Sequence, residues 1–438
     1  MKWFVGASLL LLVALAFNLG LLAYSMYALL GVMIVSRFLA RTWAESLSAT
    51  RECSRVSVNV GDTVAVVITV KNSGRLLIPW VLLEDLLPRH ALLPPPPRLG
   101  VQGRRLQLAM LRARGRKTLL YQLECRQRGY FQIGPLMMET GDLFGLHRRY
   151  RVVTEPHFLL VYPEVLALEG FDVASRRPIG EVRMTYRLYE DPTRIAGVRR
   201  YEPGDPLNRI HWRATARTGE LHSKVYEPST VAGATLVLEF HQDAYLPRDR
   251  MVRSELAVTA AASLANAVYE MNQQVGLVTN GRDAADRIRQ EGWDYDVRSR
   301  RAARRVAEMR ESSDRLQPLV VETRRGVEQL MRILETLARV ELTDGLTFPQ
   351  LVLEAASRLP RDATVLAILS SVSPETAVAL GSLRRHGFAV TAIVNVYEVH
   401  DFEEAAGRLL AEGIEARHLK DRASIPTLCR AVYGVPIR

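Results

Sequence analysis

The sequence predicts a multidomain protein with an N-terminal transmembrane hairpin, a β-sandwich and a doubly wound α/β domain. Three observations predict this class. Residues 3–40 carry no charge before Arg37, short β-like runs separated by turn residues follow from 56 to about 161, and strands alternate with helices from Ala234 onward. A chain of 438 residues is also too long for one comfortable core.

The composition is that of a globular protein, with 48% hydrophobic and 24% charged residues. The net charge of +11 suits an anionic lipid surface or an acidic partner. Nucleic acid is not expected, because no Lys/Arg block is interleaved with stacking aromatic residues. Three distant cysteines, Cys53, Cys125 and Cys429, predict a reducing compartment with neither a disulfide framework nor a zinc site.

The apolar N-terminal stretch is too long for one straight span. As a single helix, residues 3–36 would extend roughly 50 Å, against a hydrocarbon core of about 30 Å. Asn18, Leu19 and Gly20 offer a turn between the halves 3–17 and 21–36, so a hairpin within residues 1–40 is expected. A cleaved signal peptide is the rival interpretation, but the stretch is long and no small-residue cleavage site stands out.

Flanking charges predict the orientation of this hairpin. Lys2 precedes the first half, and four arginines follow the second half: Arg37, Arg41, Arg51 and Arg55. The positive-inside rule therefore places both ends in the cytoplasm. We expect a multi-pass protein of the inner (cytoplasmic) membrane whose soluble bulk is cytoplasmic.

The soluble part divides into three predicted segments. Runs such as TVAVVITV and TLLYQLEC, separated by turns, predict a β-sandwich over residues 50–162. Residues 163–230 form a connector, and residues 231–438 predict a doubly wound α/β domain with a charged insertion at about 281–320.

The connector contains an unusual run, YEPGDPLNRIHWRATARTGELHSKVYE, at residues 201–227. It follows neither helical nor strand periodicity, so we interpret it as a shaped surface segment. Asp205 could pair with Arg209 or Arg217 as a structural clasp, or the segment could dock a partner. A hydrolase using Asp205 and His211 is a third interpretation, although no nucleophile elbow or Walker loop accompanies these residues.

Three segments together resemble a bacterial membrane-protein family known as domain of unknown function fifty-eight. They are the apolar hairpin, the stretch RGYFQIGPLMMETGDLFGL and the run DPTRIAGVRRYEPGDPLNRIHWRATARTGELHSKVYE. Signature residues at the family's spacing are Arg200, Tyr201, Pro203, Gly204, Asp205, Arg209, Ile210, His211, Trp212, Ala216 and Arg217. The resemblance implies a C-terminal domain like von Willebrand factor type A. It also implies two partners, a MoxR-type AAA+ ATPase and a transglutaminase-like membrane protein, in an assembly that matures other proteins.

That resemblance raises the question of a metal site. A von Willebrand type A domain binds Mg²⁺ through Asp-x-Ser-x-Ser after its first strand, because this hard cation prefers oxygen ligands. Here the corresponding positions are Glu239, His241 and Asp243, and both serines are missing. We therefore expect no cofactor, with Glu239 and Asp243 as the ligands if Mg²⁺ did bind.

The sequence thus favours a membrane-anchored, non-enzymatic scaffold or adaptor without catalytic residues. Its docking surface would be the signature segment, where Arg and Trp side chains are typical of binding hot spots. A second candidate face is the carboxyl edge of the α/β sheet, with Glu239, His241, Asp243, Asn280 and Ser371. The alternatives are the hydrolase and an extracytoplasmic binding module.

Overall fold

A computed structural model describes residues 2–92, 96–142, 145, 147–168, 190–201, 210–228, 233–286, 316–360 and 363–428. The chain divides into two compact units. Unit 1 contains residues 1–164, 282–313 and 334–341, and unit 2 contains residues 165–281, 314–333 and 342–438. Most of the predicted charged insertion, from 287 to 315, lies outside the described residues.

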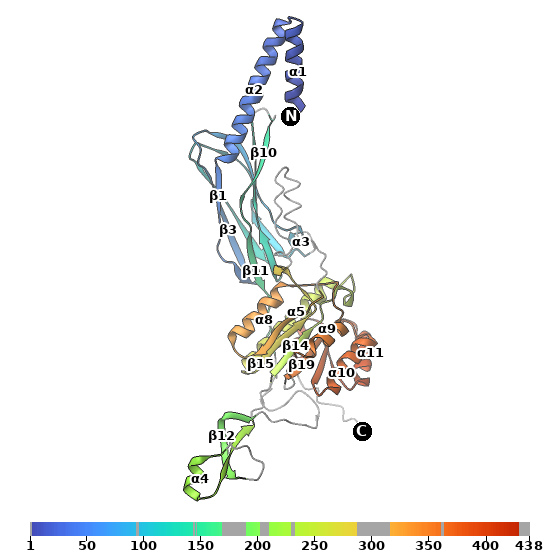
Figure 1. Cartoon of the computed structure of the whole chain (residues 1–438). Helices are drawn as coiled ribbons and strands as arrows, with labels where there is room; N and C mark the ends of the chain where they lie inside the picture. The colour runs from blue at the N-terminus through green and yellow to red at the C-terminus, as the bar shows by residue number, and fades with distance from the viewer. Residues whose placement is uncertain are drawn as a thin grey trace. The chain divides into compact units, whose positions relative to one another are not determined.

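Unit 1 begins with two apolar helices, α1 (Lys2–Ala16) and α2 (Gly20–Glu45), joined by a turn in which Asn18 has a φ of 51° (Figure 1). The turn lies where the sequence predicted it. The second helix does not end at Ser36, because Trp43 and Ala44 pack into the β-rich core and extend it. Within the described residues, α2 is long and apolar enough to cross a membrane, a property that an N-terminal signal sequence shares.

The β-rich part of unit 1 consists of three sheets. Two are four-stranded, in the orders β1-β3-β7-β5 and β10-β9-β4-β6, and the third is β2-β11-β8. The two four-stranded sheets are antiparallel and bury alternate side chains in one shared core, including Val66, Ile68, Leu83, Tyr121 and Met138. The strands are β1 (Leu47–Cys53), β2 (Ser57–Asn59), β3 (Thr63–Asn72), β4 (Ile78–Asp85), β5 (Leu99–Gly103), β6 (Leu106–Leu111), β7 (Arg116–Cys125), β8 (Gly129–Ile133), β9 (Leu136–Gly141), β10 (Arg148–Thr154) and β11 (His157–Tyr162).

Four short or shared elements complete unit 1. The helix α3 (Arg89–Leu92) follows β4, and β16 (Arg282–Asp283) pairs with β18 (Val340–Glu341). The second half of α8 (Val327–Arg339), from Leu334 onward, also belongs to this unit.

Unit 2 is built on a six-stranded sheet in the order β17-β15-β14-β19-β20-β21. All neighbouring strands are parallel except β17, which runs antiparallel to β15. The strands are β14 (Gly233–Leu238), β15 (Gln274–Thr279), β17 (Leu319–Arg324), β19 (Ala363–Leu369), β20 (Ala389–Val394) and β21 (Glu415–His418).

Helices cover both faces of this sheet, as the alternation of strands and helices predicts. One face packs Val237, Val278 and Val365 against α9 (Phe348–Ala355), α10 (Pro374–Arg385) and α11 (Val399–Ala411). The neighbouring residues Leu236 and Leu277 point to the other face, which α5 (Arg250–Glu270) contacts. Two short 3₁₀ helices, η2 (Gln242–Ala244) and η3 (Arg422–Ser424), follow β14 and β21.

The signature run is more regular than its lack of periodicity suggested. A two-stranded antiparallel ribbon, β12 (Glu190–Arg200) and β13 (His222–Pro228), encloses the short helix α4 (Trp212–Thr218). The helix ends at Gly219, whose φ of 75° suits a residue without Cβ. The run was interpreted as a shaped surface segment without helical or strand periodicity, yet residues 210–228 contain a regular helix and strand, because a helix of two turns is too short to show a period.

Candidate functional site

The carboxyl edge of the parallel sheet holds one buried carboxylate. Glu239 follows β14 directly and is 4% exposed. Its Oε2 accepts a hydrogen bond from the backbone N–H of Ser370, 3.1 Å away at the end of β19. Burial raises the pKa of Glu239 to about 7, against the lowering effect of the Ser370 and Ser371 backbone amides. This carboxyl therefore titrates near neutral pH.

Asn280, the next polar residue at this edge, links two backbone segments. Its Oδ1 accepts from the N–H of Phe240 at 2.6 Å, and its Nδ2 donates to the carbonyl of Leu346 at 2.7 Å. The hydroxyl of Tyr245 donates to the carbonyl of Glu239 at 2.8 Å. Asn280 is thus used inside the fold, which contradicts its predicted place in a ligand-facing surface.

The two predicted metal ligands have different surroundings. Asp243 is exposed, with its Oδ2 3.9 Å from Nδ1 of His241, whereas the buried Glu239 carboxylate is directed to the backbone of Ser370. Across the described part of the chain, no group of three or more His, Cys, Asp or Glu side chains could hold a metal ion. Mg²⁺ is typically held by one or two carboxylates with water completing its six ligands, but the buried Glu239 carboxylate is already engaged by a backbone amide, so the residues present do not fit Mg²⁺.

A cationic cluster beside this edge was missed by the sequence reasoning. Nη1 of Arg253 donates to Oδ1 of Asn395 at 3.2 Å and to the carbonyl of Lys420 at 2.8 Å. The guanidinium also lies 5.4 Å from the ring centroid of Tyr397. These residues come from three separate segments, so no local spacing could have revealed them.

The described signature residues lie on the β12–α4–β13 ribbon. Arg200 forms an ion pair with Glu220 at 2.8 Å, and the N–H of Tyr201 donates to the carbonyl of Leu221 at 2.9 Å. Trp212 is 68% exposed, and Arg217 is exposed on the same helix. Pro203, Gly204, Asp205 and Arg209 lie outside the described residues.

His211 has a structural role as the N-cap of α4, which could not be predicted from its residue type. It is the N-cap of α4, where its Nδ1 accepts a hydrogen bond from the N–H of Ala214 at 3.0 Å. Its backbone N–H donates to the carbonyl of His222 at 2.8 Å, which ties the helix start to β13. An Nδ1 engaged in capping is not available as a general base, so this geometry does not favour the hydrolase.

Replacing His211 by alanine is expected to loosen α4, because the loss of one cap costs about 1 kcal/mol. Hydrogen exchange at the Ala214 amide should accelerate roughly fivefold. His211→Asn is the matched control, since asparagine also caps helices and should keep the slow exchange. Equal exchange in the native protein and in His211→Ala would contradict the capping role.

The sequence reasoning also missed a polar cluster in the core of unit 1. The fully buried Arg51 side chain pairs with the carboxylate of Asp85, and its Nη1 donates to the carbonyl of Glu155 at 2.7 Å. The Tyr121 hydroxyl donates to the same carboxylate. A Cβ on Gly134, whose φ is 89°, would lie 2.3 Å from the Arg51 guanidinium, so this glycine leaves room for the ion pair.

A second buried arginine of unit 1 lies in the RGYF stretch. Nη1 of Arg128 donates to the carbonyls of Leu337 and Val340 at 2.7 and 2.9 Å. A guanidinium at these carbonyls complements the negative end of α8. The stretch singled out in the sequence thus has a helix-capping function within unit 1.

These observations define a multidomain protein with an apolar N-terminal helix, a β-rich unit and an α/β sheet whose carboxyl edge is closed by its own hydrogen bonds. Residues 197–315 match the family described as Protein of unknown function DUF58. This match supports the family that the signature resembles.

Known proteins add little about activity. The chain is 25% identical over 259 residues to the uncharacterized protein YeaD of Bacillus subtilis, a match covering 59% of this chain and 62% of the relative's length. Two solved structures resemble parts of it. The CARDB domain of PF1109 from Pyrococcus furiosus is 15% identical, and the match covers 26% of this chain and 91% of that chain with a TM-score of 0.17. Proximal thread matrix protein 1 from mussel byssus is 10% identical, and the match covers 45% of this chain and 46% of that chain with a TM-score of 0.29. At these TM-scores neither likeness carries an argument about this protein.

Proposed function

We propose that the protein is a membrane-anchored, non-enzymatic scaffold that docks a protein partner through the β12–α4–β13 ribbon. The supporting observation is the outer surface of α4. Trp212 is 68% exposed, and the arginines Arg213 and Arg217 are exposed beside it. Trp and Arg are the residue types enriched in binding hot spots.

Within this proposal, the α/β unit is an adaptor domain similar to von Willebrand factor type A domains. Numbered along the chain, its six strands lie in the order 3-2-1-4-5-6, with the third strand antiparallel. That order supports the doubly wound arrangement. Because Glu239 and Asn280 are used inside the fold, we assign docking to the ribbon rather than to a metal at the sheet edge.

For the orientation we propose that α1 and α2 form the membrane hairpin and that the bulk of the chain is cytoplasmic. Support comes from the length of α2 and from the arginines that follow its apolar part. The resemblance to the family suggests the partner, a MoxR-type AAA+ ATPase, working with a transglutaminase-like membrane protein in the maturation of other proteins.

Removal of the α4 surface is expected to abolish partner capture. In Trp212→Ala/Arg217→Ala, co-purification of the full-length protein from detergent with the AAA+ ATPase should fall at least about tenfold, because a single hot-spot side chain contributes 2 kcal/mol or more. The matched control is Leu353→Ala/Arg358→Ala, which removes an exposed apolar residue and an exposed arginine of the α9 region. Equal capture by both double variants would refute docking through α4.

A further inference from the structure

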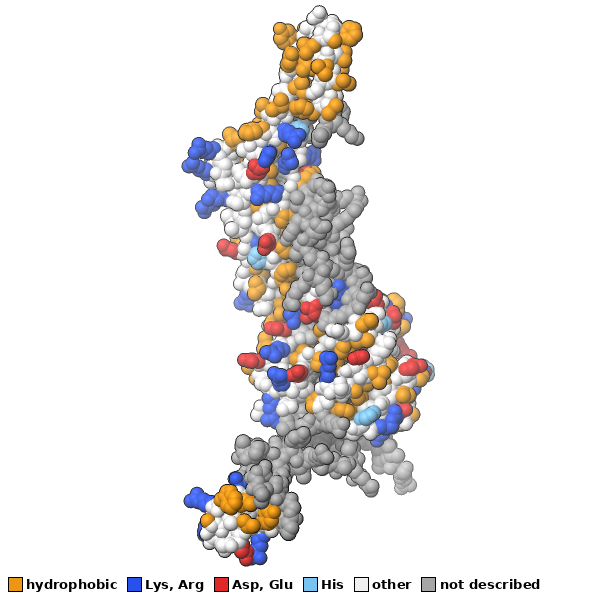
Figure 2. Space-filling view, viewed as in Figure 1, with side chains coloured by type: hydrophobic (Ala, Val, Ile, Leu, Met, Phe, Trp, Pro, Cys, Tyr) orange, Lys and Arg blue, Asp and Glu red, His pale blue; other side chains and the backbone are white. Residues whose placement is uncertain are grey.

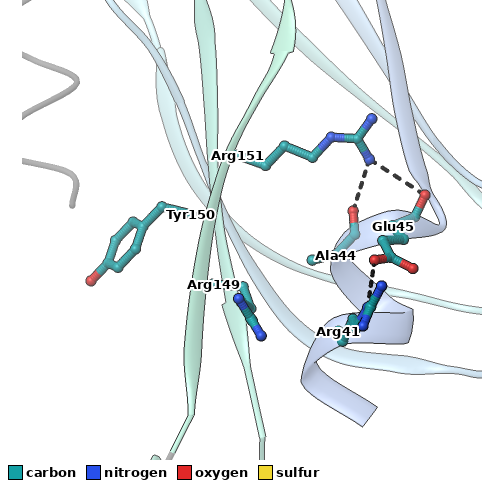
Figure 3. A pocket seen from close by; sticks show the side chains of 6 residues that line it. All are labelled: Arg41, Ala44, Glu45, Arg149, Tyr150 and Arg151. Atoms are coloured by element: carbon teal, nitrogen blue, oxygen red, sulfur yellow. Dashed lines mark hydrogen bonds and ion pairs between the residues drawn. The ribbon is translucent and has the colours of Figure 1, made fainter. Parts of the chain in front are cut away.

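Arginines surround the end of α2 where it enters the β-rich part of unit 1. A cavity of about 510 Å³ there is lined by Arg41, Ala44, Glu45, Arg149, Tyr150 and Arg151 (Figure 3). Nε of Arg41 forms an ion pair with Glu45 at 2.8 Å. The lining therefore contains three guanidinium groups and one carboxylate.

The three arginines of the cavity differ in what they already bind. Nη1 of Arg151 donates to the carbonyl of Ala44 at 3.1 Å, which satisfies the end of α2. Among the described residues, the Arg41 guanidinium pairs with Glu45, in an exposed ion pair that is weak in water. Arg149 is exposed, its backbone pairs with Thr140 in the β10–β9 ladder, and its guanidinium has no hydrogen bond or ion pair among the residues that the structure describes. Charge for an anion is thus available from Arg41 and Arg149.

Two turns of the β-sheets add further arginines at the same place. The N–H of Ser73 donates to the carbonyl of Ser46 at 2.9 Å, and the N–H of Arg114 donates to the carbonyl of Gly74 at 3.2 Å, so both turns adjoin the end of α2. Figure 2 shows Lys and Arg side chains gathered next to the apolar hairpin. We call this group the arginine collar: Arg37, Arg41, Arg75, Arg112, Arg114, Arg149 and Arg151.

The first of these turns also exposes apolar side chains. Leu76 and Leu77 follow Arg75 and are 45% and 48% exposed. An arginine beside two exposed leucines is the pattern of a surface that meets a bilayer interface, where the apolar groups enter and the charge stays at the headgroups.

The depth of the collar matches the headgroup layer. No charged residue occurs in α2 before Arg37, and Arg41 lies five residues beyond Ser36. At about 1.5 Å per residue, Arg41 is roughly 8 Å past the apolar segment, while the headgroup region of one leaflet is about 5–8 Å thick. The cavity would then lie near the outer edge of the headgroup layer, within reach of the lipid phosphates for side chains as long as arginine.

We propose that the arginine collar binds anionic phospholipid headgroups, with the lipid phosphate in the cavity between Arg41 and Arg149. This inference rests on the proposed membrane anchoring. Glu45 competes with the phosphate for Arg41, so lipid binding must displace that ion pair. A bilayer lipid is favoured over a soluble phosphate because Leu76 and Leu77 expose apolar side chains next to Arg75 of the collar.

The test is native mass spectrometry of the full-length protein in non-ionic detergent with added phosphatidylglycerol or phosphatidylcholine. The native protein should retain phosphatidylglycerol preferentially, and Arg41→Gln/Arg149→Gln should lose about tenfold in retention. The control Arg325→Gln/Arg358→Gln removes two exposed charges from unit 2 and should behave as the native protein does. Glu45→Gln should increase retention, because it frees Arg41.

Equal retention of the two lipids, or equal loss in the collar and control variants, would overturn the proposal. If inorganic phosphate displaces phosphatidylglycerol at low millimolar concentration, the site takes a soluble anion and the assignment to lipid is wrong. The thermal unfolding midpoint of Arg41→Gln/Arg149→Gln shows whether this variant is still folded. Glu45→Gln is an independent test, because it predicts an increase in lipid retention, which unfolding would not produce. Partner capture through α4 is measured in a separate experiment. A failure of the lipid-binding proposal can therefore be told apart from a failure of the docking proposal.

Discussion

Arg51→Met is expected to lower the free energy of unfolding of unit 1 by about 3–5 kcal/mol, the usual cost of breaking a buried ion pair. Both side chains of the Arg51–Asp85 pair are fully buried. Without the guanidinium, the partners of the Asp85 carboxylate in the described part of the chain are the Tyr121 hydroxyl and the nearby Arg105. Burial already raises the pKa of Asp85, and loss of Arg51 removes a group that lowers it. The variant should therefore be less destabilised in acid, where Asp85 is protonated.

Denaturant unfolding of the full-length protein in detergent, followed by hydrogen exchange of β1, β3 and β7 peptides, measures this effect. Arg126→Met is the control, because its ion pair with Glu124 is exposed and should be worth less than about 1 kcal/mol. Arg51→Met/Asp85→Leu removes both charges and should be clearly more stable than Arg51→Met alone. If the double variant loses as much stability as Arg51→Met and Asp85→Leu lose in sum when each is measured separately, the buried charge is not the cause.

Glu239→Gln is expected to remove a pH dependence of about 3 kcal/mol from the stability of unit 2. The ordinary pKa of 4.5 applies to the unfolded chain, and the folded pKa is about 7. Between these values the unfolded chain has lost the proton that the folded protein still holds. Stability therefore falls as pH rises from 4.5 to 7 and stays low above 7. Glutamine cannot ionise, so the stability of the variant relative to that of the native protein should increase as pH rises.

Unfolding followed through unit 2 peptides at pH 5, 6, 7 and 8 tests this expectation. Asp243→Asn is the matched control, because Asp243 is an exposed carboxylate of the same edge. Its stability curve should run parallel to that of the native protein. A Glu239→Gln curve that also runs parallel would show that the buried carboxyl does not titrate in this range.

The succession of strands and helices was largely predictable from the sequence. The run TVAVVITV alternates fully buried with more accessible positions in β3, and the apolar part of TVLAILSS forms β19, one of the two central strands. Asn18 marks the turn between the first two helices, where a left-handed conformation suits asparagine. These features depend on residues that are neighbours in the chain, so their pattern is visible without the fold.

The candidate sites were predictable only in part. Glu239 is found at the carboxyl edge of the sheet, as expected for a residue that follows a parallel strand. Its burial, and the orientation of its carboxylate toward Ser370, depend on a strand more than a hundred residues away. His211 was considered as a catalytic base, yet it caps α4, because the fold places its Nδ1 within reach of the Ala214 amide, a position that the sequence does not reveal.

The sequence by itself determined the apolar N-terminal segment and the signature that matches DUF58. It also determined where a strand-rich region gives way to a region of alternating strands and helices. Only the tertiary structure decided which charges are buried, as in the Arg51–Asp85 pair, and which gather around one helix end, as in the arginine collar. The physical reason is distance. Local pattern reports the burial of apolar residues a few positions apart, whereas a charge is stabilised by partners that folding brings from remote segments.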